Sequence, residues 1–216
     1  AKDGLADWWA DRLDASFFNQ IAGNTTEADV RYTGLQAAIA PDANHAIVGG
    51  GVGSTTSTTA SLSDSAGLRF TVGAIDRAVE RAKTLSPAIR PIMVGGKEFY
   101  VCFIHPYQET DLRRGAASVS DMSWADIQRA AMEGGKVSDN PIFTGALGVY
   151  NNTILHSSTR VPSGLANTRR AIFCGAQAAA VAFGKGAGPN TMTWVEELFD
   201  FENQLGVACG MIHGLK

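Results

Sequence analysis

Hydrophobic residues near the start of the chain recur every three to five positions. Such spacing places them on one face of an α-helix, and most of the charged side chains of this stretch fall off that face. The apolar positions are Leu5, Trp8, Trp9, Leu13, Phe17, Phe18 and Ile21. Gly23 and Asn24 follow, a pair typical of a helix C-terminus. The pattern predicts a helix over residues 5–21.

A second helical pattern runs from Phe70 to Leu85. Its apolar positions again share one face, and its acidic and basic side chains occupy the other. The inward positions are Val72, Ile75, Val79 and Ala82. Pro87 and Pro91 come next and favour extended chain. The sequence therefore predicts a second helix over residues 70–85.

Two stretches read as β-hairpins. In "PIMVGGKEFYVCFI" two β-rich runs flank Gly95-Gly96, a pair that accepts the positive φ of a tight turn. Residues 99–104 are apolar on both faces, so we expect this strand inside the sheet and not at its margin. "ALGVYNNTILHSSTRV" has the same character, with its turn at Asn151-Asn152.

The C-terminal stretch from Val195 to Met211 alternates with period two. Seven of its nine odd positions are apolar, and the even positions include several charged or amide side chains. Strict alternation is the signature of a strand with one buried face. The pattern predicts one long, half-buried antiparallel strand over residues 195–211.

The remaining segments read as loops and one short helix. Residues 41–67 are rich in Gly, Ser and Thr and predict a long, mobile loop, and 109–123 predicts another. "GGGVGSTT" lacks the lysine of a phosphate-binding loop, so we expect no nucleotide there. Ser123 and Asp126 resemble a capping box, which predicts a helix over residues 124–132 that ends at Gly134-Gly135.

Composition excludes several broad classes of protein. The 216 residues are 45% hydrophobic and 18% charged, with a formal net charge of −3. This charge leaves no basic footprint for sequence-specific nucleic-acid binding. No stretch reaches the roughly 20 apolar residues of a membrane-spanning helix. Three cysteines without a C-x-x-C pair favour reduced thiols.

The stretch "FYVCFIHPYQETDLRR" contains the strongest candidates for chemistry, Cys102 and His105. A thiolate nucleophile needs a positive, partly open site, but Cys102 stands between Val101 and Phe103 in a strand. His105 is three residues further on and therefore points to the opposite face. The pattern predicts a core cysteine and a histidine at the end of the strand, with a Cys–His hydrolase as the alternative.

Other ionisable residues give no recognisable site. The four histidines show no metal-binding spacing; they are His45, His105, His156 and His213. Glu196 and Glu197 are expected on opposite faces of a strand, and Asp200 and Glu202 on the solvated face with Glu196. We therefore predict no catalytic, cofactor-binding or metal-binding residues and no cofactor.

Seven blocks of the sequence, in order, carry a resemblance to a known family. They are "DGLADWWADRLDASFFNQIAGNT", "RYTGLQA…APDANH", "AIDRAVERAKTL…AIRP", "FIHPYQETDLR", "DNPIFTGALGVYNNTILH", "RAIFCGAQAAAVAFG" and "WVEELFDFENQLGVACGMIHGLK". Together they resemble the major capsid proteins of podovirus-type tailed bacteriophages typified by coliphage N-four. The resemblance covers nearly the whole chain, apart from the loop at 49–67.

The resemblance implies an α+β fold of the HK-ninety-seven type, with a peripheral and an axial domain. Residues 1–91 would supply peripheral-domain helices and the Gly/Ser/Thr loop, 92–165 mainly the axial domain, and 166–216 a return to the peripheral-domain sheet. Helix 5–21 would be the end of the long peripheral helix, with strand 195–211 in the same domain. Relatives carry an N-terminal arm and an extended loop before the position of Ala1, so we expect a longer natural chain.

The resemblance also implies a function. Such proteins are structural coat proteins that self-assemble, as hexamers and pentamers, into the icosahedral shell around phage double-stranded DNA. Expected partners are copies of the chain itself, with cement, scaffold and portal proteins as further partners and no membrane. The expected location is the virion, after assembly in the host cytoplasm. A non-viral structural or carbohydrate-binding module is a further alternative, which predicts a monomer with an aromatic-lined groove.

Overall fold

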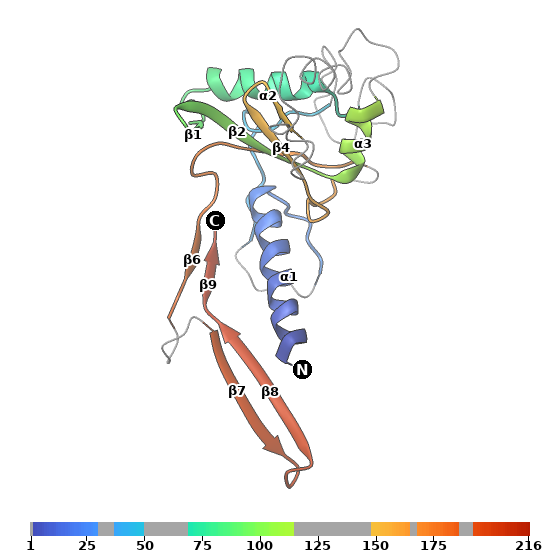
Figure 1. Cartoon of the computed structure of the whole chain (residues 1–216), viewed down its shortest axis with the longest axis vertical. Helices are drawn as coiled ribbons and strands as arrows, with labels where there is room; N and C mark the ends of the chain where they lie inside the picture. The colour runs from blue at the N-terminus through green and yellow to red at the C-terminus, as the bar shows by residue number, and fades with distance from the viewer. Residues whose placement is uncertain (1, 30–36, 50–68, 115–147, 165–167, 186–191) are drawn as a thin grey trace. The chain divides into compact units, whose positions relative to one another are not determined.

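The computed structural model of this chain describes residues 2–29, 37–49, 69–114, 148–164, 168–185 and 192–216 (Figure 1). The chain divides into two compact units. Unit 1 comprises residues 1–39 and 179–216, and unit 2 comprises residues 40–178. Both contain helices and strands, so the predicted α+β class is confirmed.

A five-stranded sheet forms the centre of unit 2. Its strands are β1 (Ile92–Val94), β2 (Lys97–Ile104), β3 (Gly148–Tyr150), β4 (Thr153–Ser157) and β5 (Ile172–Cys174). The order is β1-β2-β4-β3, and β5 follows β1 along the same edge of β2. β2 runs parallel to β4 and antiparallel to β1 and β5. The central position predicted for residues 99–104 is therefore confirmed.

Both predicted hairpin turns are present. Gly95 and Gly96 join β1 to β2 with φ of 59° and 79°, and Asn151 and Asn152 join β3 to β4 with φ of 44° and 58°. Two consecutive positive φ angles give the turn a twist that matches paired strands, and glycine and asparagine tolerate this conformation best. The second turn is also tied to α2, because Asn151 Nδ2 donates to Asp76 Oδ1 at 2.8 Å.

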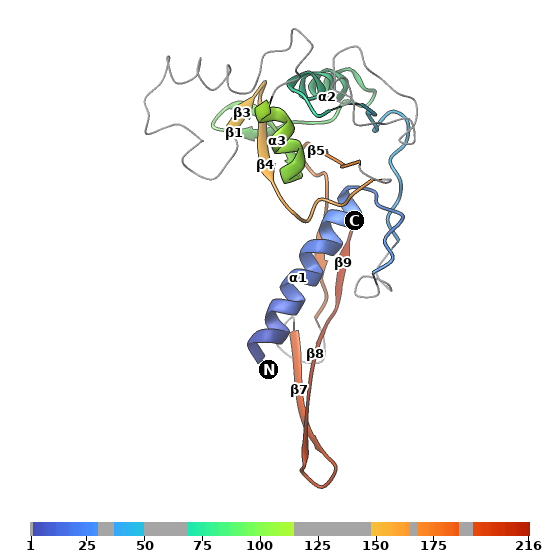
Figure 2. The same cartoon turned by 90° about the vertical axis from the view of Figure 1, so that its right-hand side faces the viewer.

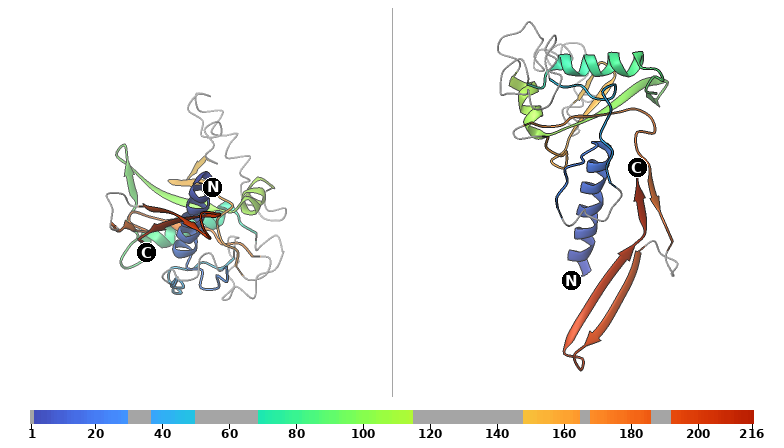
Figure 3. Two further views of the ribbon diagram at one scale, coloured as in Figure 1. Left: turned by 90° about the horizontal axis from the view of Figure 1, so that it is seen from below. Right: turned by 180° about the vertical axis from the view of Figure 1, so that it is seen from behind.

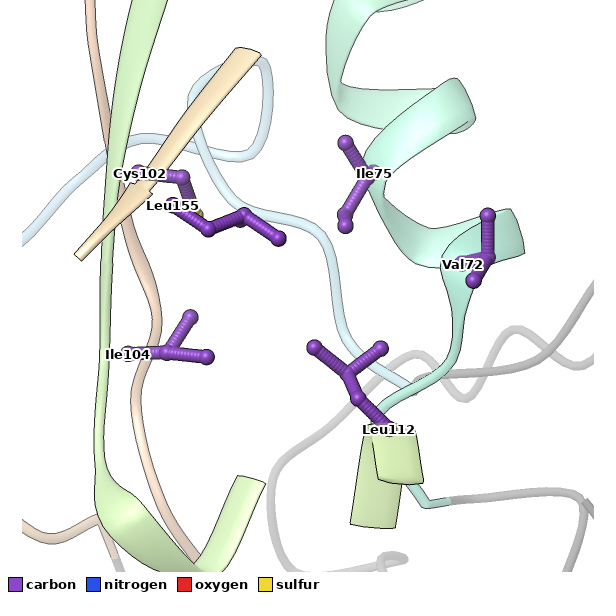
Figure 4. Close-up of a cluster of buried hydrophobic side chains, with 6 residues drawn as sticks. All are labelled: Val72, Ile75, Cys102, Ile104, Leu112 and Leu155. Carbon is purple, nitrogen blue, oxygen red and sulfur yellow. The ribbon is translucent and has the colours of Figure 1, made fainter. Parts of the chain in front are cut away.

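Two helices pack their apolar sides against this sheet. They are α2 (Val72–Thr84), close to the predicted range, and α3 (Pro106–Arg114). Side chains from both helices meet those of β2 and β4 in one buried cluster (Figure 4). Its members are Val72, Ile75, Cys102, Ile104, Leu112 and Leu155. Burying side chains of this size stabilises the fold by about 1.5–3 kcal/mol each.

Helix α3 corrects the loop predicted for residues 109–123, at least up to Arg114. Pro106 stands at the first helical position, where its missing N–H costs no hydrogen bond. Arg113 on this helix is exposed, whereas Leu112 is 2% exposed and belongs to the buried cluster. The short length of α3 left too few apolar repeats to reveal its period.

Unit 1 contains helix α1 (Lys2–Ile21), which begins earlier than predicted. Its most buried aromatic side chains are Trp9 and Phe18. In unit 1 the helix lies beside β9 (His213–Leu215), where the rings of Trp9 and His213 are 6.2 Å apart (Figure 2). β9 pairs antiparallel with β6 (Val181–Phe183). None of the helices in the described part of the chain is both long and apolar enough to cross a membrane.

The single strand predicted for residues 195–211 is wrong. The structure has a hairpin of β7 (Met192–Phe199) and β8 (Gln204–Met211), seen as the two red-orange strands in Figure 3. Odd-numbered residues of β7 pair with even-numbered residues of β8, for example Val195 with Ala208. The odd positions therefore lie on one face before the turn and on the other face after it.

Two other predictions lie wholly or partly outside the described residues. They are the helix at 124–132 and most of the loop at 41–67. The described part of that loop, 41–49, contains no helix or strand. It is held to α2 by Arg81, whose guanidinium donates to the carbonyl oxygens of Ala43 at 2.6 Å and Ala46 at 3.3 Å.

Candidate assembly surface

Cys102 lies in the core of unit 2, as predicted. Its residue is 3% exposed, and burial raises the pKa of its thiol to about 12. Cys174, on the neighbouring strand, has a thiol pKa raised to about 11 by the same cause. Cys102 pairs with Phe173 and not with Cys174, so the two thiols lie on opposite faces of the sheet. Neither environment activates a thiolate.

His105 caps helix α3. Its imidazole Nδ1 accepts a hydrogen bond from the backbone N–H of Tyr107 at 3.2 Å, and its backbone N–H donates to Gln108 Oε1 at 3.0 Å. This reciprocal arrangement satisfies backbone groups that a helix start leaves open. Burial and the charge of Arg169 lower the pKa of His105, which keeps the imidazole neutral. The imidazole therefore orders the backbone and is not set up as a base for Cys102.

The other candidate residues are dispersed. His45 Nδ1 lies 2.6 Å from Asp42 Oδ1 in an exposed turn, and His156 lies against the ring of Phe103. Within the described ranges, no three His, Cys, Asp or Glu side chains gather closely enough to hold a metal ion. Burial and the charge of Arg12 lower the pKa of His213.

The acidic residues near the C-terminus are arranged differently from the prediction. Glu196 and Glu197 lie on opposite faces of β7, as expected. Asp200 and Glu202, however, lie in the turn and share no strand face with Glu196. The sequence pattern missed this because it treated the turn residues as a continuation of the strand.

The β7–β8 hairpin exposes apolar side chains on both faces. One face, here the Trp194 face, is apolar apart from Glu196, whose Oε1 accepts a hydrogen bond from Trp194 Nε1 at 2.6 Å. The apolar members of this face are Met192, Trp194, Leu198, Leu205, Val207, Cys209 and Met211. The opposite face carries Val195 and Phe199, each at least half exposed. Two strands alone are marginally stable in water, so such a hairpin needs a covering partner.

Small residues on β8 bring the two strands of the hairpin close on the face opposite Trp194. A Cβ atom at Gly206 would collide with the ring of Phe199, which lies over this glycine. Thr193 Oγ1 donates to the carbonyl oxygen of Gly210 at 3.1 Å. The hairpin is thus internally ordered although its outer surfaces are open.

A shallow apolar groove adjoins the hairpin within unit 1. It is lined by Gly4, Leu5 and Trp8 of α1 and by Val207 of β8. The Arg12 guanidinium lies 5.1 Å from the centre of the Trp8 ring, a distance typical of cation–π contacts. The groove, the Trp194 face and the hairpin tip (Asp200, Phe201 and Glu202, between β7 and β8) are the candidate surface for contact with other protein.

The chain is similar to phage capsid proteins. The family model described as "Phage capsid protein" matches residues 1–216. No curated protein sequence matches the chain. The capsid structure of Ralstonia phage GP4 is 33% identical over the whole chain, with a TM-score of 0.71. The capsid of cyanophage Pam1 is 17% identical, with a TM-score of 0.64, and shares the fold.

The chain is shorter than both of these proteins. It covers 61% of the Ralstonia phage chain and 67% of the cyanophage chain, while all of it is matched in each comparison. Because the family model extends over every residue, the chain belongs to the phage capsid protein family.

Proposed function

We propose that this chain is a major part of a structural coat protein that self-assembles into the icosahedral shell around phage double-stranded DNA. The family match over residues 1–216 carries the proposal. The exposed apolar hairpin supports it, because permanent assemblies bury such surfaces between subunits. An enzymatic role has no support, since Cys102 is buried and His105 caps a helix.

We further propose the HK-ninety-seven type of shell, of the podovirus kind typified by coliphage N-four. Unit 1, with α1 and the hairpin, would correspond to the peripheral domain, and unit 2 to the axial domain. This proposal differs from the division that the resemblance implied, because residues 40–91 and 166–178 belong to unit 2 and would therefore be part of the axial domain. The coat protein would form hexamers and pentamers, meet cement, scaffold and portal proteins, and assemble in the host cytoplasm before residing in the virion.

Electron microscopy of the full-length product tests the proposed function. The full-length gene is expressed, and the lysate is fractionated by sedimentation and imaged by negative stain. Closed hollow particles or regular capsomers are the expected result, because self-complementary faces generate closed symmetric assemblies. A product that stays monomeric across a wide range of concentration and salt would overturn the coat-protein proposal.

A further inference from the structure

The turn of the β7–β8 hairpin presents an aromatic side chain to solvent. Asp200, Phe201 and Glu202 have φ of 53°, 54° and 71°, and the turn is closed by the Asn203 N–H, which donates to the Asp200 carbonyl at 3.0 Å. Positive φ is costly for residues other than glycine, and three in succession are uncommon. Phe201 is completely exposed. A strained turn that displays a free phenyl ring has the features of a binding anchor.

The charge of the hairpin restricts what can bind it. Residues 192–215 contain four carboxylates, at Glu196, Glu197, Asp200 and Glu202, and no lysine or arginine. Two such tips meeting each other would bring carboxylates of like sign together, which is unfavourable. A partner surface with cations and an exposed aromatic ring fits the tip better.

Unit 2 provides such a surface. From Asn140 to Ala178, within unit 2, the sequence has no aspartate or glutamate, and Arg160, Arg169 and Arg170 lie in this stretch. The Arg169 guanidinium lies 5.0 Å from the centre of the Tyr107 ring, and Tyr107 is 62% exposed.

Helix α3 also carries two acidic residues, Glu109 and Asp111. Glu109 Oε1 is engaged by Arg113 at 2.6 Å, within the helix. Counted over whole units, unit 1 is acidic and unit 2 is slightly basic. Unit 1 carries 5 basic and 10 acidic residues, and unit 2 carries 13 basic and 11 acidic residues.

We propose that the hairpin tip of one copy docks on the Tyr107–Arg169 surface of a second copy. This inference rests on the proposed coat-protein function. Phe201 packs against Tyr107 and the flat side of the Arg169 guanidinium, and Asp200 and Glu202 lie beside the cationic groups. The two contacting patches are different, so the contact is head-to-tail and builds rings or extended arrays.

Charge reversal in the full-length capsid protein tests this contact. Glu202→Arg and Arg169→Glu should each lower the yield of shells at low salt about tenfold, because each places like charges together. Phe201→Ala should lower the yield by a similar factor through loss of the aromatic anchor. Sedimentation and negative-stain microscopy measure the yield, and circular dichroism confirms folding of each variant.

A charge swap distinguishes a lost contact from a damaged fold. The double variant Glu202→Arg with Arg169→Glu should recover the yield to within about threefold of the original protein. An equal mixture of the two single variants should also recover much of the yield, which happens only when the contact joins different chains. Asp14→Arg, an exposed position on α1 with the same change of charge, is the matched control and should assemble normally.

The outcomes separate this inference from the coat-protein function. If the original protein forms shells and all three single variants match its yield, docking on Tyr107–Arg169 is wrong and the function stands. Rescue by the double variant but not by the mixture would place the contact within one chain and overturn the inference. A density map of the shell with tip against tip would overturn it as well.

Discussion

The neutral imidazole of His105 ties the end of β2 to the start of α3. Its Nδ1 can accept the Tyr107 N–H only while it carries no proton, and the lowered pKa keeps it in that form. The unfolded chain therefore binds a proton more readily than the folded chain just below the ordinary histidine pKa of about 6.5. Because protonation favours the unfolded chain, His105 contributes fully to stability above that pKa. This contribution is lost as the pH falls toward the lower pKa that His105 has in the folded protein.

We expect His105→Asn to remove this part of the pH dependence. Asparagine is a good helix cap and has no titrating group, so the helix start is retained. The measurement is the free energy of unfolding from denaturant titrations at about pH 8 and about pH 5. The free energy of unfolding should change less between these two pH values in the variant than in the original protein. His213 contributes equally to the change in both proteins. An identical pH dependence would contradict the assigned role of His105.

Cys102 should resist alkylation in the folded protein. With its thiol buried and the pKa raised to about 12, the thiolate fraction stays negligible between about pH 6 and pH 9. Iodoacetamide labelling followed by mass spectrometry should find Cys102 unmodified until denaturant is added. Cys209, which is partly exposed on β8, serves as the internal comparison. Rapid labelling of Cys102 in folded protein would restore the thiol-enzyme alternative.

At the scale of elements, local patterns predicted α2 and the two hairpins β1–β2 and β3–β4 of unit 2 from the sequence, but not α3 or β5. The turns at Gly95-Gly96 and Asn151-Asn152 carry residues that tolerate positive φ, and α2 has a clear apolar face. The β7–β8 hairpin was not predictable in this way. Its turn has no glycine, and Phe201 continues the apolar alternation of the strand. Period-two patterns identify strands, but they do not reveal a reversal made by ordinary residues at positive φ.

Close packing between elements makes Gly175 sensitive to substitution. A Cβ atom there would collide with the backbone carbonyl of Arg90 and lie 2.5 Å from Ile89 Cγ2. The backbone pairs at this point, since the Ala176 N–H donates to the Arg90 carbonyl at 2.7 Å, and it cannot easily move. We expect Gly175→Ala to lower the free energy of unfolding by about 1–3 kcal/mol, measured by denaturant titration.

Gly4→Ala is the matched control for this substitution. Gly4 lies in α1, and a Cβ atom there meets nothing within 4 Å. Alanine restricts the unfolded chain and favours helix, so this variant should be unchanged or more stable by about 0.5–1 kcal/mol. Equal effects of the two substitutions would show that packing at Gly175 is looser than described.

At the scale of the whole molecule, the two units differ in charge. Unit 1 has a formal charge of −5 and unit 2 of +2, which together give the −3 of the chain. Separated charge of opposite sign favours ordered association between copies and steers their encounter. Dissolved salt weakens this attraction, because the Debye screening length is about 10 Å at 0.1 M salt and charges further apart than this interact little.

Assembly of the full-length protein should therefore slow as salt increases. We expect the initial rate of light scattering to fall severalfold between about 0.05 M and 0.5 M salt, because screening weakens the attraction between the units of different copies. Potassium chloride and sodium chloride should act alike. A rate that rises steadily with salt would indicate association driven by apolar contact alone.

The absence of lysine and arginine from the hairpin also decides which reagents can report on it. Between Lys185 and Lys216 the chain has no trypsin cleavage site, so a digest releases residues 186–216 as one peptide. Amine-reactive cross-linkers have no lysine to react with between these two residues. They will therefore give no cross-link from the hairpin, even where it contacts a neighbouring subunit. Carbodiimide coupling through its carboxylates, or thiol reagents at Cys209, would be needed to map it.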